Sequence, residues 1–269
     1  MICFPNAKIN LGLHVTGKRA DGYHSIESIF YPVNIEDALE AVPNDSDECN
    51  FHFSGAQIEG TTENNLVYKA WKLLRDRHQI GGVDFALLKK IPMGAGMGGG
   101  SADGAFALKL LNDLFKLNLS PQTLKAYSAQ LGSDCAFFIE NRPCFASGRG
   151  EILEPIELDL SAYHFAFIKP PIHVGTAEAY QLITPAPSEV DLKQLIQEPV
   201  NTWKDKLSND FEAPIASKYP EIAKAKETLY EVGAIYASMT GSGSAVYGIF
   251  ESVPVKPVGL PSGWGYFGG

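Results

Sequence analysis

The glycine-rich stretch from Ile91 to Asp103, IPMGAGMGGGSAD, constrains the fold of this chain more than any other. Glycine lets the backbone take a positive φ and approach a ligand closely, so successive N–H groups can turn toward the oxygens of an anion. Apolar residues at helical spacing follow and predict a helix that begins at Ser101. The macrodipole of such a helix adds about half a positive charge at its N-terminus. The stretch therefore predicts a phosphate-binding loop made by the backbone.

Two better-known glycine loops do not fit this stretch. Gly94, Gly96 and Gly99 satisfy the spacing G-x-G-x-x-G, but dinucleotide-binding folds place an acidic residue at the end of a second strand roughly 20 residues later, and here that interval is predicted helix. A P-loop requires Lys after its last glycine, whereas Gly100 runs directly into Ser101. The cation that holds the phosphates must come from elsewhere. A flexible linker is the remaining alternative, although linkers do not join an apolar strand to an apolar helix.

The composition is that of an acidic globular protein, long enough for two domains. The 269 residues carry 22 Lys and Arg against 31 Asp and Glu, a formal net charge of −9 at pH 7, so a broad surface for nucleic acid is not expected. The four cysteines form no C-x-x-C pair and the six histidines show no H-E-x-x-H spacing. No signal peptide and no apolar run of ~18 residues is visible. We expect a cytoplasmic protein that binds no membrane.

Strict alternation of polar and apolar residues from Lys8 to Val15 predicts a half-buried strand. Lys8 and Asn10 share its polar face, roughly 7 Å apart along the strand, and can reach into one cleft. An exposed polar face is the alternative. The next turn, KRADGYH, brings Tyr23 and His24 close to two cations, which suits stacking on a planar, charged ligand but equally suits a solvated surface turn.

Periodicity and turn residues predict most of the remaining elements. The expected strands and helices are two strands around residues 44–48, a helix from Leu66, a strand at 83–87, a helix at 121–131, a turn at 148–151, a strand at 165–169, helices at 192–197, 209–217 and 220–232, and strands at 235–240 and 245–250. Ser120 and Pro121 begin the second helix after the loop, and Gly132 ends it. The Pro- and Gly-rich segment after residue 254 receives no assignment. Residues 239–244 form a second glycine loop, for which a hairpin turn and a ligand contact are both compatible.

Asp134 has two possible roles on position alone. It stands between the end of a predicted helix and the apolar residues 137–139. An acid at such a place commonly serves as a cap or turn residue. It is also suited to act as a catalytic carboxylate.

Four motifs together resemble the superfamily of galactokinase, homoserine kinase, mevalonate kinase and phosphomevalonate kinase, the GHMP kinases. They are AKINLGLHVTGKRADGYH at residues 7–24, IPMGAGMGGGSAD at 91–103, LGSDCAFF at 131–138 and MTGSGSAVYGIF at 239–250. The first motif is similar to that of the 4-diphosphocytidyl-2-C-methyl-D-erythritol kinases and separates these from their relatives. Asn6, Met97 and Ala136 stand where this family usually has proline, leucine and proline, which puts only local geometry in question.

The resemblance implies an α+β fold of two domains. These would be an N-terminal nucleotide-binding domain at residues 1–158 and a C-terminal ferredoxin-like domain at residues 159–269, with the active site between them. It implies ATP and Mg²⁺ as cofactors and a cytidine diphosphate methylerythritol as the small-molecule substrate. The implied reaction is phosphorylation of a hydroxyl of that substrate in non-mevalonate isoprenoid biosynthesis, by a monomer or weak homodimer.

The resemblance also implies a set of site residues but no metal ligand. Lys8 and Asp134 would be the catalytic pair. Asn10, Tyr23 and His24 would help to hold the cytidine substrate, and Tyr180 matches a position where the family places an aromatic ring against cytosine. The residues that would wrap the ATP phosphates are Pro92, Met93, Gly94, Ala95, Gly96, Met97, Gly98, Gly99, Gly100, Ser101 and Ala102.

Two rival functions belong beside this interpretation. Another kinase of the same superfamily could act on a sugar, homoserine or mevalonate, and the KRADGYH turn argues against it. A non-catalytic nucleotide-binding or RNA-binding module could share the N-terminal fold. The acidic composition and the presence of both Lys8 and Asp134 argue against that second rival.

Overall fold

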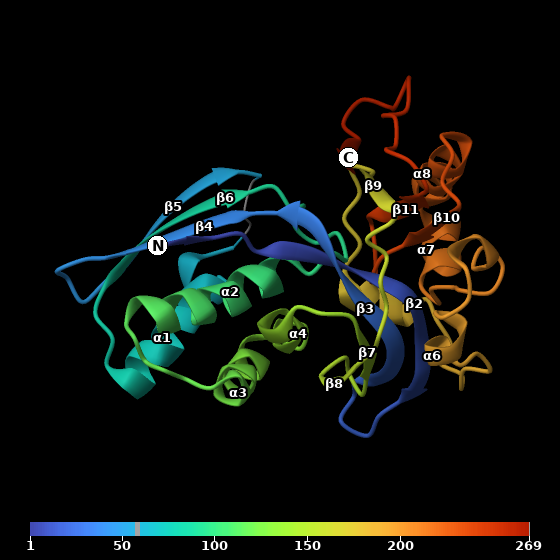
Figure 1. The fold of residues 1–269 in the computed structure, drawn as a ribbon. Coiled ribbons are helices and arrows are strands. Elements are labelled where there is room, and N and C mark those ends of the chain that lie inside the picture. Colours follow the sequence, from blue (N-terminus) through green and yellow to red (C-terminus); the bar gives the residue numbers. More distant parts are fainter. Residues whose placement is uncertain (57–59, 269) are drawn as a thin grey trace. The chain divides into compact units, whose positions relative to one another are not determined.

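The computed structural model describes residues 1–56 and 60–268 of the chain. The chain divides into two compact units, and both are discontinuous in sequence (Figure 1). The first unit comprises Met1–Ala7, Asn34–Met93 and Gly98–Arg142, and the second comprises Lys8–Val33, Gly94–Met97 and Pro143–Gly269. The glycine-rich stretch therefore contributes its central residues to the second unit and its flanks to the first. The predicted domain ranges 1–158 and 159–269 are a different division, and they stay a prediction.

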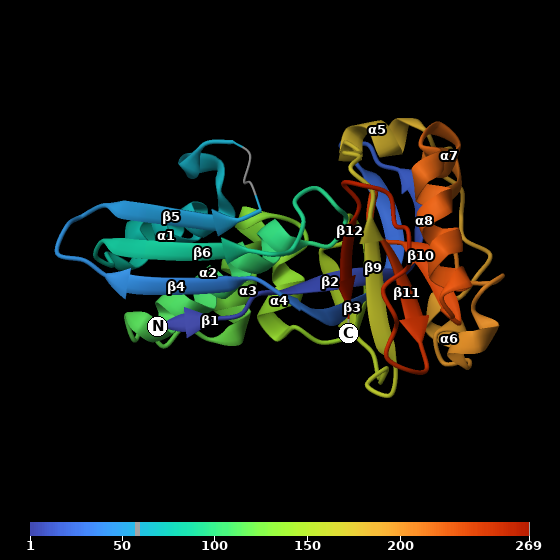
Figure 2. The same ribbon diagram turned by 90° about the horizontal axis from the view of Figure 1, so that it is seen from above.

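A four-stranded sheet forms one layer of the first unit. Its strands are β1 (Ile2–Cys3), β4 (Ala38–Pro43), β6 (Val83–Lys89) and β5 (Cys49–Gly55), in that spatial order. Figure 2 shows them side by side, with β5 parallel to β6 and the other pairs antiparallel. Val83, Phe85 and Leu87 alternate along β6 and are all buried, because one face of the strand carries its apolar residues. The strands predicted around residues 44–48 and at 83–87 are confirmed.

Helices form the other layer of the first unit. They are α1 (Leu66–His78), α2 (Gly99–Leu114), α3 (Pro121–Leu131) and α4 (Cys135–Glu140), with a short 3₁₀ turn, η1 (Thr62–Asn64). Figure 1 shows α1 and α2 along one face of the sheet. Ser120 caps α3 through its hydroxyl, Pro121 opens it, and the helix ends before Gly132, as predicted. The start of α2 corrects the prediction of Ser101, because Gly98 takes a left-handed conformation and the helix begins at Gly99.

Two further sheets lie mainly in the second unit. One has the order β2 (Asn6–Lys18), β3 (His24–Glu36), β7 (Cys144–Ser147) and β8 (Ile152–Pro155). The other has the order β10 (Tyr236–Met239), β11 (Val246–Phe250), β9 (His164–Lys169) and β12 (Gly265–Gly268), and all its pairs are antiparallel. The predicted strands at 165–169, 235–240 and 245–250 are confirmed with small shifts at their ends. β12 lies in the tail that received no assignment.

The prediction that β2 is half-buried is wrong. Residues 6–15 are buried on both faces, including Lys8, Asn10 and His14, which are 4%, 1% and 7% exposed. The polar face is covered because distant polar groups of the same unit reach it. The Tyr247 hydroxyl, for example, donates to the Asn10 carbonyl at 2.9 Å. The alternation of polar and apolar residues thus identifies the two faces of this strand but does not tell which face is exposed to solvent.

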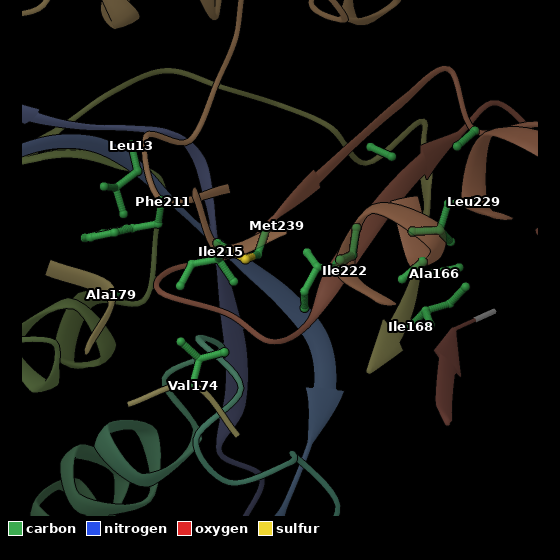
Figure 3. Packing of buried hydrophobic residues seen from close by; sticks show 14 of the residues in the cluster. Leu13, Ala166, Ile168, Val174, Ala179, Phe211, Ile215, Ile222, Leu229 and Met239 are labelled. Carbon is green, nitrogen blue, oxygen red and sulfur yellow. The ribbon is translucent and has the colours of Figure 1, made fainter. Parts of the chain in front are cut away.

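Helices and a large apolar core complete the second unit. The helices are α5 (Thr176–Gln181), α6 (Leu192–Leu195), α7 (Glu212–Lys218) and α8 (Pro220–Glu231), with a 3₁₀ turn, η2 (Val200–Thr202). Helix α8 lies along β10 and β11, and α7 packs against α8 (Figure 2). Their apolar faces, with Ile215, Ile222 and Leu229, pack with Leu13 of β2 and Met239 of β10 (Figure 3). Among the described residues, no helix is long and apolar enough to span a membrane. The expected α+β class is confirmed.

Candidate functional site

The centre of the first glycine loop packs on the second glycine loop within the second unit. The Thr240 hydroxyl donates to the Gly96 carbonyl at 3.1 Å, and the Ala245 N–H donates to the Ala95 carbonyl at 3.2 Å. Gly96 has a φ of 76°, and a Cβ at this position would lie 2.0 Å from the Thr240 carbonyl oxygen. Only glycine fits here. The second loop is therefore both the hairpin turn between β10 and β11 and the support of the first loop.

Lys8 and Asn10 stand beside these loops on β2. The Lys8 ammonium donates to the Asn10 side-chain oxygen at 2.6 Å and lies 4.6 Å from the centroid of the Phe30 ring. The Lys8 N–H donates to the Met97 carbonyl at 3.0 Å, and the Asn10 N–H donates to the Thr240 hydroxyl at 3.1 Å. The prediction that Lys8 and Asn10 point the same way is confirmed. A buried cation is thus fixed next to the glycine loop, which carries none of its own.

The N-terminus of α2 belongs to the first unit and starts without a side-chain cap. Its N-cap residue, Gly98, has a φ of 70° and no side chain. The N–H groups in the first turn of an α-helix have no partner within the helix, so residues 99–101 present backbone donors together with the positive end of the macrodipole. Ser101 adds a hydroxyl to this turn. Backbone donors at a helix start suit phosphate oxygens.

The acid motif lies next to the first turn of α2 within the first unit. Ser101 is hydrogen-bonded to the Cys135 thiol, and burial raises the pKa of that thiol to about 12, so the cysteine stays protonated. A Cβ on Gly132 would lie 3.3 Å from the Cys135 sulfur and 3.9 Å from the Ser101 hydroxyl. Asp134 occupies the N-cap position of α4 but makes no capping hydrogen bond with it. The position of Asp134 allows a capping role or a catalytic role, and the missing capping bond disfavours the first.

Two of the predicted substrate residues form an aromatic stack in the second unit. The His24 and Tyr180 rings lie 4.5 Å apart between centroids, with an interplanar angle of 11°. Tyr180 stands on α5 and meets Phe211 edge to face at 4.9 Å. Tyr23 is 58% exposed, and the Arg149 guanidinium lies 4.9 Å from its ring centroid. The structure therefore brings His24 and Tyr180 together and leaves much of the Tyr23 ring open to solvent.

Asp210 ties the aromatic stack to β2. Its carboxylate accepts the Val15 N–H at 2.8 Å and lies 3.1 Å from His14 Nδ1. Burial alone would raise the pKa of Asp210, but these two hydrogen bonds and the His14 charge hold it below its ordinary value. Phe211, which follows directly, is thereby placed against Tyr180. The segment before α7 positions this part of the site.

Sequence reasoning missed three side chains that shape the loops and the stack. They are Thr240, Phe211 and His173, whose imidazole would lie 2.8 Å from a Cβ placed on Gly94. The motif MTGSGS contains Thr240, and a hydroxyl in a glycine turn is the signal that could have identified it. Phe211 and His173 carry no such signal, because their roles depend on partners far away in the chain. In the described part of the chain, no group of three or more His, Cys, Asp and Glu side chains is arranged to hold a metal ion.

Comparisons with known proteins cover most of the chain. Residues 65–142 match the model of the GHMP kinases N terminal domain, and residues 192–256 match that of the GHMP kinases C terminal domain. The chain is 51% identical to the 4-diphosphocytidyl-2-C-methyl-D-erythritol kinase of Parabacteroides distasonis over 93% of this chain and 92% of that one. It is 51% identical to the enzyme of that name from Bacteroides thetaiotaomicron, over 96% and 94%. A crystal structure of 4-(cytidine 5'-diphospho)-2C-methyl-D-erythritol kinase, 32% identical, superimposes with a TM-score of 0.79 and covers 93% and 90% of the two chains.

Proposed function

Because the chain belongs to the 4-diphosphocytidyl-2-C-methyl-D-erythritol kinases, a branch of the GHMP kinases, we propose that it transfers the γ-phosphoryl group of ATP to a hydroxyl of that cytidine substrate. The reaction is a step of non-mevalonate isoprenoid biosynthesis. The observation that carries the proposal is the packing of the two glycine loops, with the Lys8 N–H bonded to the Met97 carbonyl of the first loop. The Lys8 ammonium, which donates to the Asn10 side chain on the same strand, is the cation that the sequence of the glycine loop lacks.

Phosphoryl transfer requires positioning and charge stabilisation more than covalent chemistry. In the proposed mechanism, residues 92–102 wrap the ATP phosphates, and the backbone N–H groups that follow Pro92 hold them. The Lys8 ammonium balances negative charge between the nucleophile and the γ-phosphate. Asp134 orients the substrate hydroxyl and accepts its proton. Asn10, which accepts from Lys8 at 2.6 Å, holds the ammonium in place.

Mg²⁺ is part of the proposed reaction as the partner of ATP. It keeps several water ligands and is usually bound through substrate phosphates and one or two carboxylates rather than by an all-protein cage. Its role would be to neutralise charge on the phosphate oxygens during transfer.

The substrate site in this proposal is built around aromatic rings. Tyr180 and Tyr23 are the stacking surfaces for cytosine, and His24 and Asn10 supply hydrogen bonds to the substrate. The observed stack of His24 on Tyr180 supports the assignment, because it shows that a planar ring lies favourably on Tyr180. A nucleobase has a face of the same kind.

Substrate-dependent ADP release tests the function. The purified chain is supplied with ATP and Mg²⁺ and then with the cytidine substrate, mevalonate, homoserine or galactose, one at a time. We expect release above background with the cytidine substrate alone. Release with another alcohol at an equal or greater rate would reassign the enzyme within the GHMP kinases, and release with none would remove the kinase assignment.

A further inference from the structure

A buried ion cluster lies directly beneath the start of α2 in the first unit. Lys89, the last residue of β6, is 1% exposed and donates both to the Asp37 carboxylate and, at 2.7 Å, to Asp103 Oδ2. The two acids are 0% and 3% exposed. Charged side chains are almost never buried to this degree unless they are paired. We name Lys89, Asp37 and Asp103 the Lys89 cluster; it holds one ammonium for two carboxylates.

The two carboxylates of the Lys89 cluster are not equivalent. Asp37 accepts the Lys90 N–H at 2.5 Å and the Ile91 N–H at 2.8 Å in addition to the Lys89 ammonium. Asp103 accepts from the ammonium through Oδ2 and also interacts with the Asp37 side chain, while its other oxygen, Oδ1, is buried with no hydrogen-bond partner among the described residues. Hydrogen bonds to a carboxylate favour its charged form, and a second carboxylate nearby disfavours it. Asp103 is therefore the member that takes a proton first.

The electrostatics of Asp103 agree with this geometry. Burial raises the pKa of Asp103 to about 7, the Lys89 ammonium opposes the shift, and the Asp37 carboxylate adds to it. Cys3 of β1 also feels the Asp103 charge, but burial raises the pKa of its thiol to about 12, so it stays neutral near pH 7. Asp37, Lys89 and Cys3 are the titratable groups that act with Asp103 from the neighbouring elements. A change of charge near pH 7 thus belongs to Asp103.

The Lys89 cluster touches the proposed phosphate site through the first turn of α2. A Cβ on Gly99 would lie 3.0 Å from the Lys89 nitrogen, so the first turn of α2 lies directly against the ammonium. Asp103 is four residues into the helix, about 6 Å along its axis from Gly99. With both acids ionised the cluster carries a net charge of −1, which opposes an anion at the helix start. With Asp103 protonated the net charge is zero.

We propose that Asp103 takes up a proton when the phosphates of ATP bind at the N-terminus of α2, so that the Lys89 cluster sets the ATP affinity of the loop. This inference rests on the proposed function, because it places the ATP phosphates on residues 92–102. Asp103 acts through α2 and not by contact with ATP, so it is a positioning residue. In both protonation states, Lys89 and Asp37 hold the start of the glycine-rich stretch in place, because Asp37 accepts the Ile91 N–H.

The sign of the effect follows from proton linkage. Negative charge at the helix start disfavours the ionised form of Asp103, so binding raises its pKa and draws in a proton. ATP affinity is then highest at pH values where Asp103 is already protonated, falls as pH rises through its pKa, and levels off once Asp103 is ionised with and without ATP. Two unit charges about 10 Å apart at an effective dielectric constant of about 20 change an equilibrium constant roughly tenfold. We expect a change of that order between pH 6 and pH 9.

The test is calorimetric titration of the full chain with a non-hydrolysable ATP analogue at pH 6, 7.5 and 9. Each titration is repeated in two buffers of different ionisation enthalpy, which reports the protons taken up. We expect uptake near pH 7.5 in the wild type and none attributable to the protein in Asp103→Asn. At pH 9 Asp103→Asn should bind the analogue about tenfold more tightly than the wild type, and at pH 6 the two should be equal. The analogue's own groups also gain or lose protons with pH, but this affects both proteins equally and cancels in the ratio of their affinities.

Asp113→Asn is the matched control, because Asp113 is exposed near the opposite end of α2. It should follow the wild type at every pH. Proton uptake equal in the wild type and Asp103→Asn, or weaker binding by a folded Asp103→Asn at pH 9, would overturn the inference while leaving the kinase assignment intact. Absence of analogue binding by the wild type would instead overturn the proposed function and this inference with it. If Asp103→Asn does not fold, the wild-type buffer comparison decides alone: zero uptake at pH 7.5 refutes the proposal.

Discussion

The carbonyl oxygen of Gly96 accepts a hydrogen bond from the hydroxyl of Thr240, 144 positions away, at 3.1 Å. This bond holds the centre of one glycine loop on the turn of another. The backbone of the first loop is therefore shaped by a partner that no local pattern reveals. Its conformation can be tested one glycine at a time.

Gly96→Ala should destabilise the fold and abolish ATP binding. The new Cβ would meet the Thr240 carbonyl oxygen at 2.0 Å, and the φ of 76° is strained for any residue with a side chain. We expect a loss of more than about 1 kcal/mol in the free energy of unfolding, measured by urea denaturation. The control is Gly100→Ala, where a Cβ meets nothing within 4 Å and the backbone is helical. That variant should keep wild-type stability; equal losses in both would mean that loop packing is not what Gly96 protects.

Asp134→Asn and Lys8→Met should each lower kcat by about 10² to 10⁴ fold. Their effects should not multiply if the two residues act as one device in phosphoryl transfer. The double variant would then be scarcely slower than the slower single variant. Steady-state kcat for the four proteins measures this. ATP affinity is the control for Asp134→Asn, since the glycine loop and not the carboxylate holds the phosphates. A double variant whose loss equals the product of the two single losses contradicts the coupled mechanism, and near-normal turnover of Asp134→Asn removes this residue from catalysis.

Tyr180→Ala should weaken binding of the cytidine substrate by about 1 to 3 kcal/mol, the range found when an aromatic partner of a base is removed. Tyr180→Phe is the matched control, because it keeps the ring that lies 4.5 Å from His24. Tyr23→Ala should show a similar loss without a change in stability, since Tyr23 is 58% exposed. Equilibrium titration with the cytidine substrate gives both values. Normal affinity in the two alanine variants would mean that the base binds elsewhere.

Asp210→Asn should make stability less dependent on pH in acid. Burial would raise the pKa of Asp210, but hydrogen bonds from His14 and the Val15 N–H hold it below its ordinary value. A lowered pKa stabilises the fold above the unfolded value of about 3.9, and this contribution is lost as pH falls through the lower folded value. We expect Asp210→Asn to cost about 1 kcal/mol at pH 7 and the difference from wild type to close below pH 4.

The measurement is the urea midpoint at pH 7, 5, 4 and 3, with Asp113→Asn as the control for removing an exposed acid. A gap between wild type and Asp210→Asn that stays constant down to pH 3 would show that the carboxylate charge is not what holds the segment before α7.

Most helices and strands of this fold were predictable, because each is marked by residues within the element or directly beside it. Ser120, Pro121 and Gly132 bound α3 by capping chemistry alone. Alternation at Val83, Phe85 and Leu87 records the buried face of β6. Helix α5 was missed because its six residues are too few to show a period, and β12 was missed because it is built from glycines and aromatic residues in a Pro-rich tail.

The candidate site was predictable where a motif is written in consecutive residues. Lys8 and Asn10 lie two positions apart on one strand, and their contact follows from strand geometry. The stack of Phe211 on Tyr180 and the Lys89 cluster were not predictable, since each depends on pairing between separate segments. Asp103 is the last residue of the glycine-rich stretch 91–103, yet its burial beside Lys89 and Asp37 comes from the packing of α2 on the sheet.

The burial of both faces of β2 has a consequence for how the protein is made. The Asn10 N–H bonds to the Thr240 hydroxyl, 230 positions later, and the Tyr247 hydroxyl completes the cover. At a synthesis rate of about 5 to 20 residues per second, the ribosome needs roughly 10 to 50 s to produce the partner after Asn10 has been made. Throughout that time Asn10 lacks both of these hydrogen-bond partners. The nascent chain can therefore complete the surroundings of β2 only when translation is almost complete.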